Sequence, residues 1–318
     1  MADDPRQTDG PLPVPPRQAA RLMRAATHAS VTVAVALTLA KLAAWLVTDS
    51  VSLLSTLLDS LLDAAASVIN LIAVHHALQP ADEDHRFGHG KAEPLAGLAQ
   101  AAFISGSAVF LIVQAGQRLF HPRAVVNPEV GYVVLAVSIA LTLVLVVFQK
   151  YVVRRTGSVA IGADSLHYQT DILVNASIVV SLVLSSRFGW TAADPLFALA
   201  IAGYILWGAI GIGTKAYNIL MDRELPEADR LRIREVTVGV PGVLGVHDVR
   251  TRSSGPQVFI QLHLELKDDM ALDAAHEIAL AVERALLAAY PRAEVLVHPD
   301  PVSVVGAMRD REAALGES

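Results

Sequence analysis

The chain has 318 residues, of which 53% are hydrophobic and 18% are charged, and its mean hydropathy is +0.46. This balance favours a membrane protein over a large soluble one, and the net charge of −6 argues against nucleic acid as a partner. The sequence contains no cysteine, which excludes disulfides and thiolate metal sites.

The chain starts with a polar, proline-rich stretch without an apolar core. We therefore expect residues 1–27 to form a disordered tail and not a cleaved signal peptide. A helix needs about 20 mostly apolar residues to cross a bilayer, and six later segments qualify. They are residues 30–47, 51–78, 94–117, 130–148, 158–186 and 195–214. The prediction is an α-helical membrane protein with six transmembrane helices in a domain of residues 28–221.

The loops on one side of this predicted bundle are rich in lysine and arginine. With an even number of spans, both termini lie on that same side. The basic residues there are Arg6, Arg17, Arg21, Arg24, Arg86, Lys91, Lys150, Arg154 and Arg155, against Arg118, Arg123 and Arg187 on the other side. Basic loops stay in the cytoplasm, so both termini are expected to be cytoplasmic.

Two of the predicted spans carry ionisable residues with helical spacing. Asp59 and Asp63 are four residues apart in the second span, and His167 and Asp171 are four apart in the fifth. Each pair lies on one helix face, so two helices meeting there would present three carboxylates and one imidazole, a tetrahedral set for Zn²⁺ or a similar ion. The alternative is polar pairing that only packs the helices. Asp164, one turn before His167, fits either a proton relay or a packing role.

The loop after the second span contains three further residues of the kinds that bind metals. Asp82, His85 and His89 are spaced i, i+3 and i+7, and Gly88 and Gly90 give the segment a flexible backbone. This pattern predicts a second, exposed metal site. An ordinary acidic loop that contains histidines is the alternative.

Residues 222–305 are predicted to form a small soluble α+β domain. Helical spacing, two alternating segments separated by Gly255-Pro256, an amphipathic helix and a last apolar segment give the order αββαβ, typical of helices covering one face of a three-stranded sheet. Residues 306–318 are expected to be a disordered tail. Ligand-type residues stand near the ends of these elements, and each alone would be read as an ordinary histidine or aspartate: His247, His263, His276, His298 and Asp300.

Four stretches of the sequence carry a family resemblance. "LLDSLLD", "ADEDHRFGHGKAE", "SLHYQTDIL" and "LMDRELP" resemble motifs of the cation diffusion facilitator family, and are most similar to its bacterial zinc and iron efflux transporters. The resemblance covers about residues 28–305. It implies six transmembrane helices and a metallochaperone-like cytoplasmic domain.

The resemblance also implies roles for particular residues. It assigns a transport site to Asp59, Asp63, His167 and Asp171, a loop site to Asp82, His85 and His89, a binuclear cytoplasmic cluster to His247, His263, His276, His298 and Asp300, and a charge pair that interlocks two protomers to Lys91 and Asp222. Pro299, between two of the cluster residues, departs from some relatives.

We therefore expect a homodimer in a bacterial inner membrane that exports Zn²⁺, with Cd²⁺ or Fe²⁺ as alternatives, in exchange for protons by alternating access. Two other functions are kept open. One is a passive or uptake carrier for divalent metals, and the other is a membrane-anchored metal sensor. An enzyme is not expected, because no nucleophile elbow or phosphate-binding loop is evident.

Overall fold

The computed structural model describes residues 14–48, 51–120, 130–190 and 192–306. The chain divides into two compact units. One comprises Arg17–Leu220, and the other comprises Met221–Ser318 together with Met1–Pro16. The predicted tails are outside the described residues up to residue 13 and from residue 307 onward.

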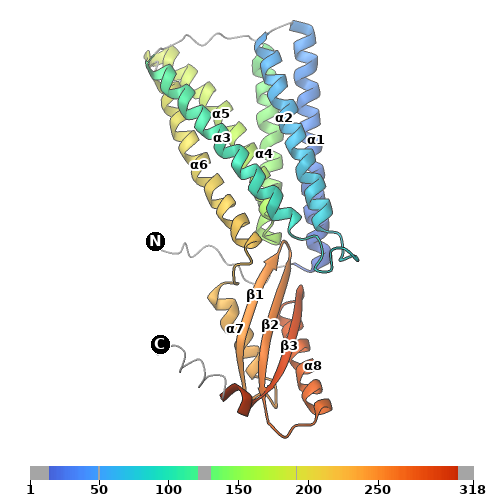
Figure 1. The fold of residues 1–318 in the computed structure, drawn as a ribbon. Helices are drawn as coiled ribbons and strands as arrows, with labels where there is room; N and C mark the ends of the chain where they lie inside the picture. The colour runs from blue at the N-terminus through green and yellow to red at the C-terminus, as the bar shows by residue number, and fades with distance from the viewer. Residues whose placement is uncertain (1–13, 49–50, 121–129, 191, 307–318) are drawn as a thin grey trace. The chain divides into compact units, whose positions relative to one another are not determined.

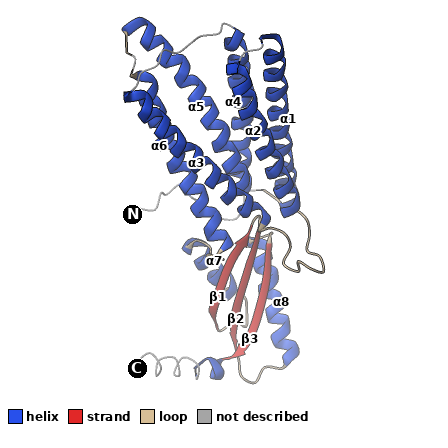
Figure 2. Ribbon diagram, turned by 45° about the horizontal axis from the view of Figure 1, so that its top comes forward, coloured by secondary structure: helices blue, strands red, loops and turns tan. Residues whose placement is uncertain are grey.

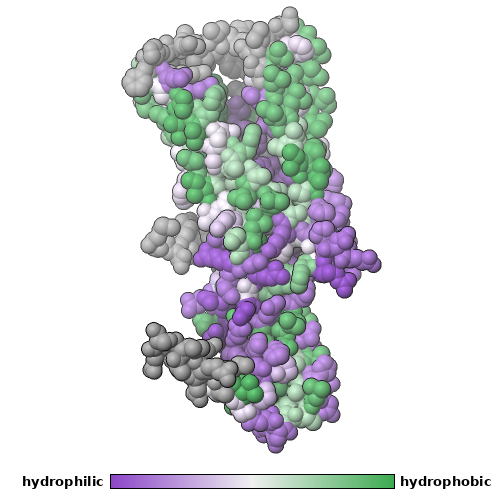
Figure 3. All heavy atoms as spheres, in the orientation of Figure 1, coloured by the Kyte–Doolittle hydropathy of each residue, from purple (hydrophilic) through white to green (hydrophobic). Residues whose placement is uncertain are grey.

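The first unit is a bundle of long helices (Figure 1). They are α1 (Pro16–Thr48), α2 (Val51–Ala77), α3 (Ala92–Phe120), α4 (Val130–Thr156), α5 (Val159–Phe188) and α6 (Ala193–Leu220). Over the described residues, all of them except α5 are long and apolar enough to cross a membrane. The described part of α5 contains Asp164, His167 and Asp171, which lower its hydropathy. The space-filling view in Figure 3 shows hydrophobic residues spread over the outward faces of these helices, as expected for surfaces that meet lipid.

Helix α5 lies in the middle of this bundle. It packs against α3, α4 and α6 and also contacts α2. Its Leu166 is buried with Ile104 of α3 and Ile205 of α6, and Gly208 of α6 lets Leu166 approach closely. The polar face of α5 is consequently held at a fixed orientation toward α2.

The expectation of a disordered tail over residues 1–27 is wrong for its second half, because α1 begins at Pro16. Proline suits the first position of a helix, where its missing N–H leaves no hydrogen bond unmade. Ala19, Met23 and Ala26 then recur at helical spacing and are buried. Met23 and Ala26 pack with Val74 of α2. Tertiary packing extends the helix beyond the apolar span.

The second unit has the predicted αββαβ order (Figure 2). Its elements are α7 (Glu227–Val238), β1 (Gly245–Ser254), β2 (Gln257–Leu266), α8 (Leu272–Ala289) and β3 (Ala293–Pro301). The strands lie in the order β1-β2-β3, with β1 antiparallel and β3 parallel to β2. The turn between β1 and β2 contains Gly255 with a positive φ of 55°, which glycine adopts without strain.

Both helices of this unit cover one face of the sheet. Alternate residues of β2, including Ile260, Leu262 and Leu264, are buried with Ile233 of α7 and Val282 of α8. Because side chains alternate along a strand, the residues between them point to the other face. That second face, opposite α7 and α8, carries the histidines described below.

Candidate metal sites

The two intramembrane pairs predicted from helical spacing meet between α2 and α5. Nε2 of His167 lies 2.8 Å from Oδ1 of Asp63. Ligand atoms of Asp63, His167 and Asp171 all lie within 4.8 Å of one another. The side chain of His167 is 12% exposed and that of Asp63 is 23% exposed, so both are largely removed from solvent. Two carboxylates and an imidazole converge here, and this is the donor chemistry of a zinc-type ion.

Asp59 stands at the edge of this group. It is exposed on α2, one helical turn before Asp63, and its carboxylate lies within Coulomb range of Asp171. It is not among the three residues whose ligand atoms already converge. Its role as the fourth ligand stays a prediction.

A buried polar network surrounds Asp164, the residue left without an assigned role. Its Oδ2 accepts hydrogen bonds from Ser30 Oγ at 2.6 Å and from Gln149 Nε2 at 2.7 Å, and its Oδ1 accepts a longer one from Gln100 Nε2 at 3.4 Å. These donors come from α1, α4 and α3, so the carboxylate of Asp164 ties three helices to α5 one turn before His167. The sequence offered no signal for this network, because its members are far apart along the chain.

Two further ionisable groups bear on the site. Nζ of Lys41 on α1 donates to Ser60 Oγ at 2.5 Å and to the carbonyl of Thr56 at 3.4 Å, which places its charge beside the turn of α2 that carries Asp59. The buried Glu93 of α3 accepts a hydrogen bond from the backbone N–H of Val159 at 2.8 Å. It thereby caps the first turn of α5, where a helix has unpaired N–H groups.

The predicted loop site is assembled between α2 and α3. Oδ1 of Asp82 accepts the backbone N–H of His85 at 2.6 Å, and Oδ2 of Asp82 lies 3.3 Å from Nε2 of His89. The hydrogen bond from the His85 N–H holds the pKa of the Asp82 carboxyl below its usual value. Ligand atoms of the three residues lie within 4.8 Å of one another. The spacing i, i+3, i+7 thus forms a compact group, and its metal binding remains a prediction.

In the second unit, strand register lines up three of the predicted histidines. His247 on β1 is opposite His263 on β2, which is opposite His298 on β3. Asp300 reaches all three: its carboxylate oxygens lie 2.7 Å from His263 Nδ1, 3.2 Å from His298 Nε2 and 3.5 Å from His247 Nε2. We call these four residues the histidine row. Pro299 does not disturb it, because side chains alternate along β3 and Pro299 points away from Asp300.

Two acidic residues beside this row were missed in the sequence. Oε1 of Glu265 lies 3.2 Å from Nδ1 of His247, and Oδ2 of Asp248 lies 3.9 Å from Nε2 of His263. Arg250 hydrogen-bonds to Asp248 and lowers its pKa. Glu265 follows His263 by two residues, and this alternation could have identified it. Asp248 could not be found that way, because it has a positive φ of 44° at an irregularity in β1.

Three other predicted residues lie outside these groups. His276 is exposed on α8, which covers the sheet face opposite the histidine row. Lys91 donates to the carbonyl of Leu220 at 3.4 Å, and Asp222 accepts from Arg252 at 3.4 Å. The proposed pairing of Lys91 with Asp222 stays a prediction.

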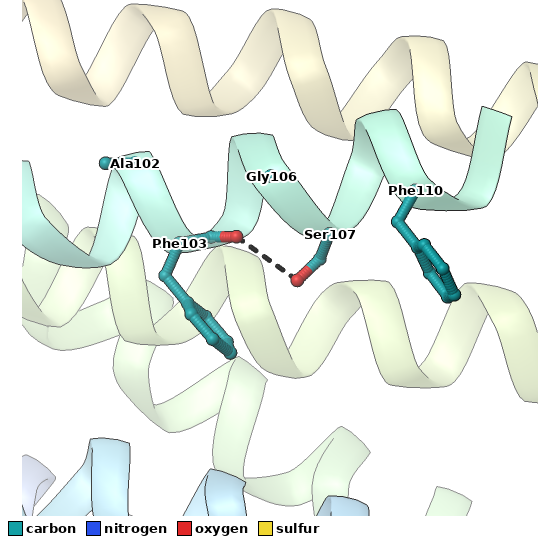
Figure 4. Close-up of a pocket in the computed structure, with 5 residues that line it drawn as sticks. All are labelled: Ala102, Phe103, Gly106, Ser107 and Phe110. Carbon is teal, nitrogen blue, oxygen red and sulfur yellow. Dashed lines mark hydrogen bonds between the residues drawn. The ribbon is translucent and has the colours of Figure 1, made fainter. Parts of the chain in front are cut away.

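A surface pocket of ≈ 390 Å³ lies on α3 and is lined by Ala102, Phe103, Gly106, Ser107 and Phe110. Figure 4 shows both phenyl rings projecting from the helix, and Ser107 Oγ donating to the carbonyl of Phe103. Neither a carboxylate nor an imidazole lines this pocket, so it does not offer metal ligands.

Known sequences resemble both units. Residues 27–221 match the family described as "Cation efflux transmembrane domain", and residues 225–302 match "Cation efflux protein, cytoplasmic domain". The cation-efflux pump FieF of Serratia proteamaculans is 52% identical over 91% of this chain and 96% of its own length. FieF of Salmonella arizonae is 50% identical over 90% and 95% respectively. These relatives are pumps and not enzymes, which agrees with the prediction for this chain.

Among solved structures, MamM CTD variants are similar to part of this chain. One in a nickel form is 31% identical over 24% of this chain and 98% of its own length, with a TM-score of 0.23. Another in a cadmium form is 32% identical over 24% of this chain and 95% of its own length, with the same TM-score.

Proposed function

The chain belongs to the cation efflux family of membrane transport proteins, and we propose that it exports Zn²⁺ from the cytoplasm in exchange for protons, with Cd²⁺ and Fe²⁺ as further substrates. The observation that carries this proposal is the convergence of Asp63, His167 and Asp171 between two membrane helices. Intramembrane ionisable groups are costly and mark transport pathways. The named relatives, which are cation-efflux pumps, support the direction of transport.

The donor set favours this substrate class. With Asp59 as the fourth ligand, three carboxylates and one imidazole would form a harder set than thiolates, which would accept several divalent ions, and the nitrogen ligand would favour Zn²⁺ over Mn²⁺. A count of formal charge agrees with a divalent ion. Asp59, Asp63 and Asp171 together carry −3, and Lys41 carries +1, so a bound M²⁺ makes the loaded site neutral. A neutral loaded site has a lower electrostatic energy inside the low-dielectric membrane than a charged one.

The contact between His167 and Asp63 supports the proposed exchange with protons. Their 2.8 Å separation requires a shared proton, and a metal can use Nε2 only after that proton has left it. Metal and proton therefore compete for the same atoms. Asp164 and its donors hold α5 in place, while Glu93 caps the turn where α5 starts.

We also propose that the protein is a homodimer of the bacterial inner membrane with both termini in the cytoplasm. The matched cytoplasmic family domain supports dimerisation. In such a dimer the histidine row would bind regulatory metal, and the exposed His276 would approach the row of the second copy. Lys91 and Asp222 would interlock the membrane domains.

Transport by purified protein in liposomes tests the proposal. A zinc-sensitive dye inside the vesicles should report uptake for the unmodified chain and for His28→Ala, an exposed histidine on α1 that serves as a control. Asp63→Ala and His167→Ala should not transport. Undiminished flux in both variants would contradict the assignment. A passive carrier would show flux that follows the metal gradient alone.

A further inference from the structure

The loop site has a histidine beside it that neither the spacing of the loop nor the family resemblance assigns. His76 is the second-last residue of α2 (Val51–Ala77) and is exposed. Its ring centroid lies 4.4 Å from that of His89, with an interplanar angle of 60°. His85 also contacts His89, with ring centroids 4.5 Å apart. His89 is therefore flanked by one imidazole from the loop and one from the helix.

His89 itself is the buried member of this cluster. Its side chain is 4% exposed, and its Nε2 lies near Asp82, whereas its Nδ1 is buried without a hydrogen-bond partner among the described residues. An unsatisfied buried polar atom costs about 1–3 kcal/mol. The free-energy cost of the unsatisfied Nδ1 has an explanation if the cluster binds a ligand, because the His89 imidazole is then held ready for that ligand.

The loop group has fewer ligands than a closed zinc site. Asp82, His85 and His89 supply three donors, whereas a closed structural zinc site has four protein ligands in a tetrahedron. We propose that His76 is the fourth protein ligand of the loop site, which then binds Zn²⁺ or a similar divalent cation through three imidazoles and one carboxylate. This inference rests on the proposed function in treating the loop as a metal site.

We expect a side-chain movement of His76 to complete the site. His76 is not within the group of three whose ligand atoms already lie within 4.8 Å of one another, but its ring is in contact with one of them. Its exposure at the end of a helix leaves other rotamers free. Metal binding would pull the ring of His76 in and would fasten the end of α2 to the loop. Because α2 also carries Asp63, loop metal would restrain the helix that supplies the transport site.

The preceding residue provides a matched control. His75 is exposed and is on the same last turn of α2, but successive residues of a helix point about 100° apart. Among the described residues, no ring contact joins His75 to the loop. A general effect of removing a histidine from this turn should appear in both variants, whereas loss of a ligand should appear only in His76→Ala.

The test uses the full-length chain in detergent, with Asp63→Ala and Asp300→Ala introduced to weaken the other two sites. Co²⁺ is added, and its visible absorption reports both affinity and coordination geometry, since tetrahedral Co²⁺ absorbs far more strongly than octahedral Co²⁺. The background chain and His75→Ala should show the tetrahedral band. His76→Ala should bind Co²⁺ about 10–100-fold more weakly, and its visible spectrum should differ from that of His75→Ala because one imidazole ligand is lost. Thermal melting without metal should be the same for both single variants.

Two results would overturn the proposal. Equal affinity and equal spectra for His76→Ala and His75→Ala would show that water or another group completes the site. A Co²⁺ affinity and spectrum that are both unchanged in Asp82→Ala would show that the loop does not hold the ion. Neither result bears on transport, which is measured separately with the chain that keeps Asp63 and Asp300, so failure of this inference is distinguishable from failure of the proposed function.

Discussion

The helical unit and the sheet domain both gather histidines and aspartates, but the two groups are positioned by different structural rules. In the membrane unit, His167 meets Asp63 because each lies in a pair spaced by one helical turn, and two helices bring the pairs together. In the sheet domain, His247, His263 and His298 are brought into a row by strand register. The first arrangement lies between α2 and α5, whereas the second lies on the sheet face opposite α7 and α8.

This difference leads us to propose separate roles for the two groups. A site between two helices can change its access when the helices move, because its ligands belong to separate rigid elements. A row across hydrogen-bonded strands keeps its geometry, since each strand fixes the next. We therefore expect the helical site to carry the moving ion and the histidine row to hold a resident one.

The largest expected effect is on transport, when one ligand is removed from the helical site and the result is compared with removal of one ligand from the histidine row. Asp63→Ala should lower the rate of zinc transport by about 100-fold or more, because the ion loses a ligand and the charge balance of the site. Asp300→Ala should lower that rate by less than about 10-fold, since it disturbs only the row. Dye-loaded liposomes measure both. Equal losses in the two variants would remove the distinction between the sites.

The next largest effect is expected on stability when Asp164 is replaced, and it tests how rigidly the helical site is held. Asp164→Ala would remove the acceptor of the amides of Gln149 and Gln100, and would leave the hydroxyl of Ser30 with only its longer contacts to Ser67 and Tyr168. At about 1–3 kcal/mol for each buried group left unsatisfied, partly relieved by repacking, we expect a loss of about 3 kcal/mol in stability. Thermal melting in detergent should detect it.

Asp164→Asn provides the control for this network. Its amide oxygen still accepts from Gln149 or Ser30, so its melting temperature should fall between those of the unmodified chain and Asp164→Ala. A melting temperature for Asp164→Ala equal to that of the unmodified chain would mean that the network does not hold α5.

A smaller effect, on the zinc affinity of the histidine row, is expected when Gly245 of the sheet domain is replaced by alanine. A Cβ at this position would lie 2.5 Å from Oε2 of Glu265, so Gly245→Ala should displace that carboxylate from His247. Zinc affinity of the row should fall by about 10-fold, as measured by calorimetric titration in an Asp63→Ala background. Transport by Gly245→Ala alone should stay within about twofold of normal, and Ser253→Ala, at the far end of the same strand, is the control.

The smallest effect concerns the stability of the sheet domain at high pH, remote from any metal. Burial and the charge of Asp229 raise the pKa of Tyr290 to about 12, and its hydroxyl donates to that carboxylate at 3.1 Å. The folded state therefore holds the tyrosine proton more tightly than the unfolded state. The resulting stabilisation is complete below about pH 10 and is lost as the pH rises toward about 12.

Tyr290→Phe cannot ionise, so it should show a shallower fall in stability across that pH range. Denaturant unfolding followed by far-ultraviolet circular dichroism from pH 9 to pH 12 measures the slope. A slope unchanged by the substitution would show that another group dominates unfolding in alkali.

The same two rules explain what could be predicted from the sequence. The pairs Asp59/Asp63 and His167/Asp171 are visible because helical spacing places each pair on one face, and two such pairs in apolar spans indicate a polar site inside the membrane. The αββαβ order is visible because its periodicities change from 3.6 to 2 residues and its turn contains Gly255. The residues of the loop group are close in the sequence, so their spacing was sufficient to predict that their side chains lie together.

Other features depend on contacts between distant residues. The partners of Asp164 lie on α1, α3 and α4, and no local pattern links them. Asp248 reaches the histidine row only because β1 is irregular between His247 and Arg250. The start of α1 at Pro16 depends on packing against α2, which apolar composition alone does not report.

The central claim is that metal and proton compete for one site between α2 and α5. It is tested most directly by recording the internal pH and the internal zinc of the same liposomes after zinc is added outside. The proposal predicts that zinc entry is accompanied by proton exit, and that both signals disappear together in Asp63→Ala and in His167→Ala. Zinc entry without any proton movement, or zinc entry that persists in both variants, would contradict it.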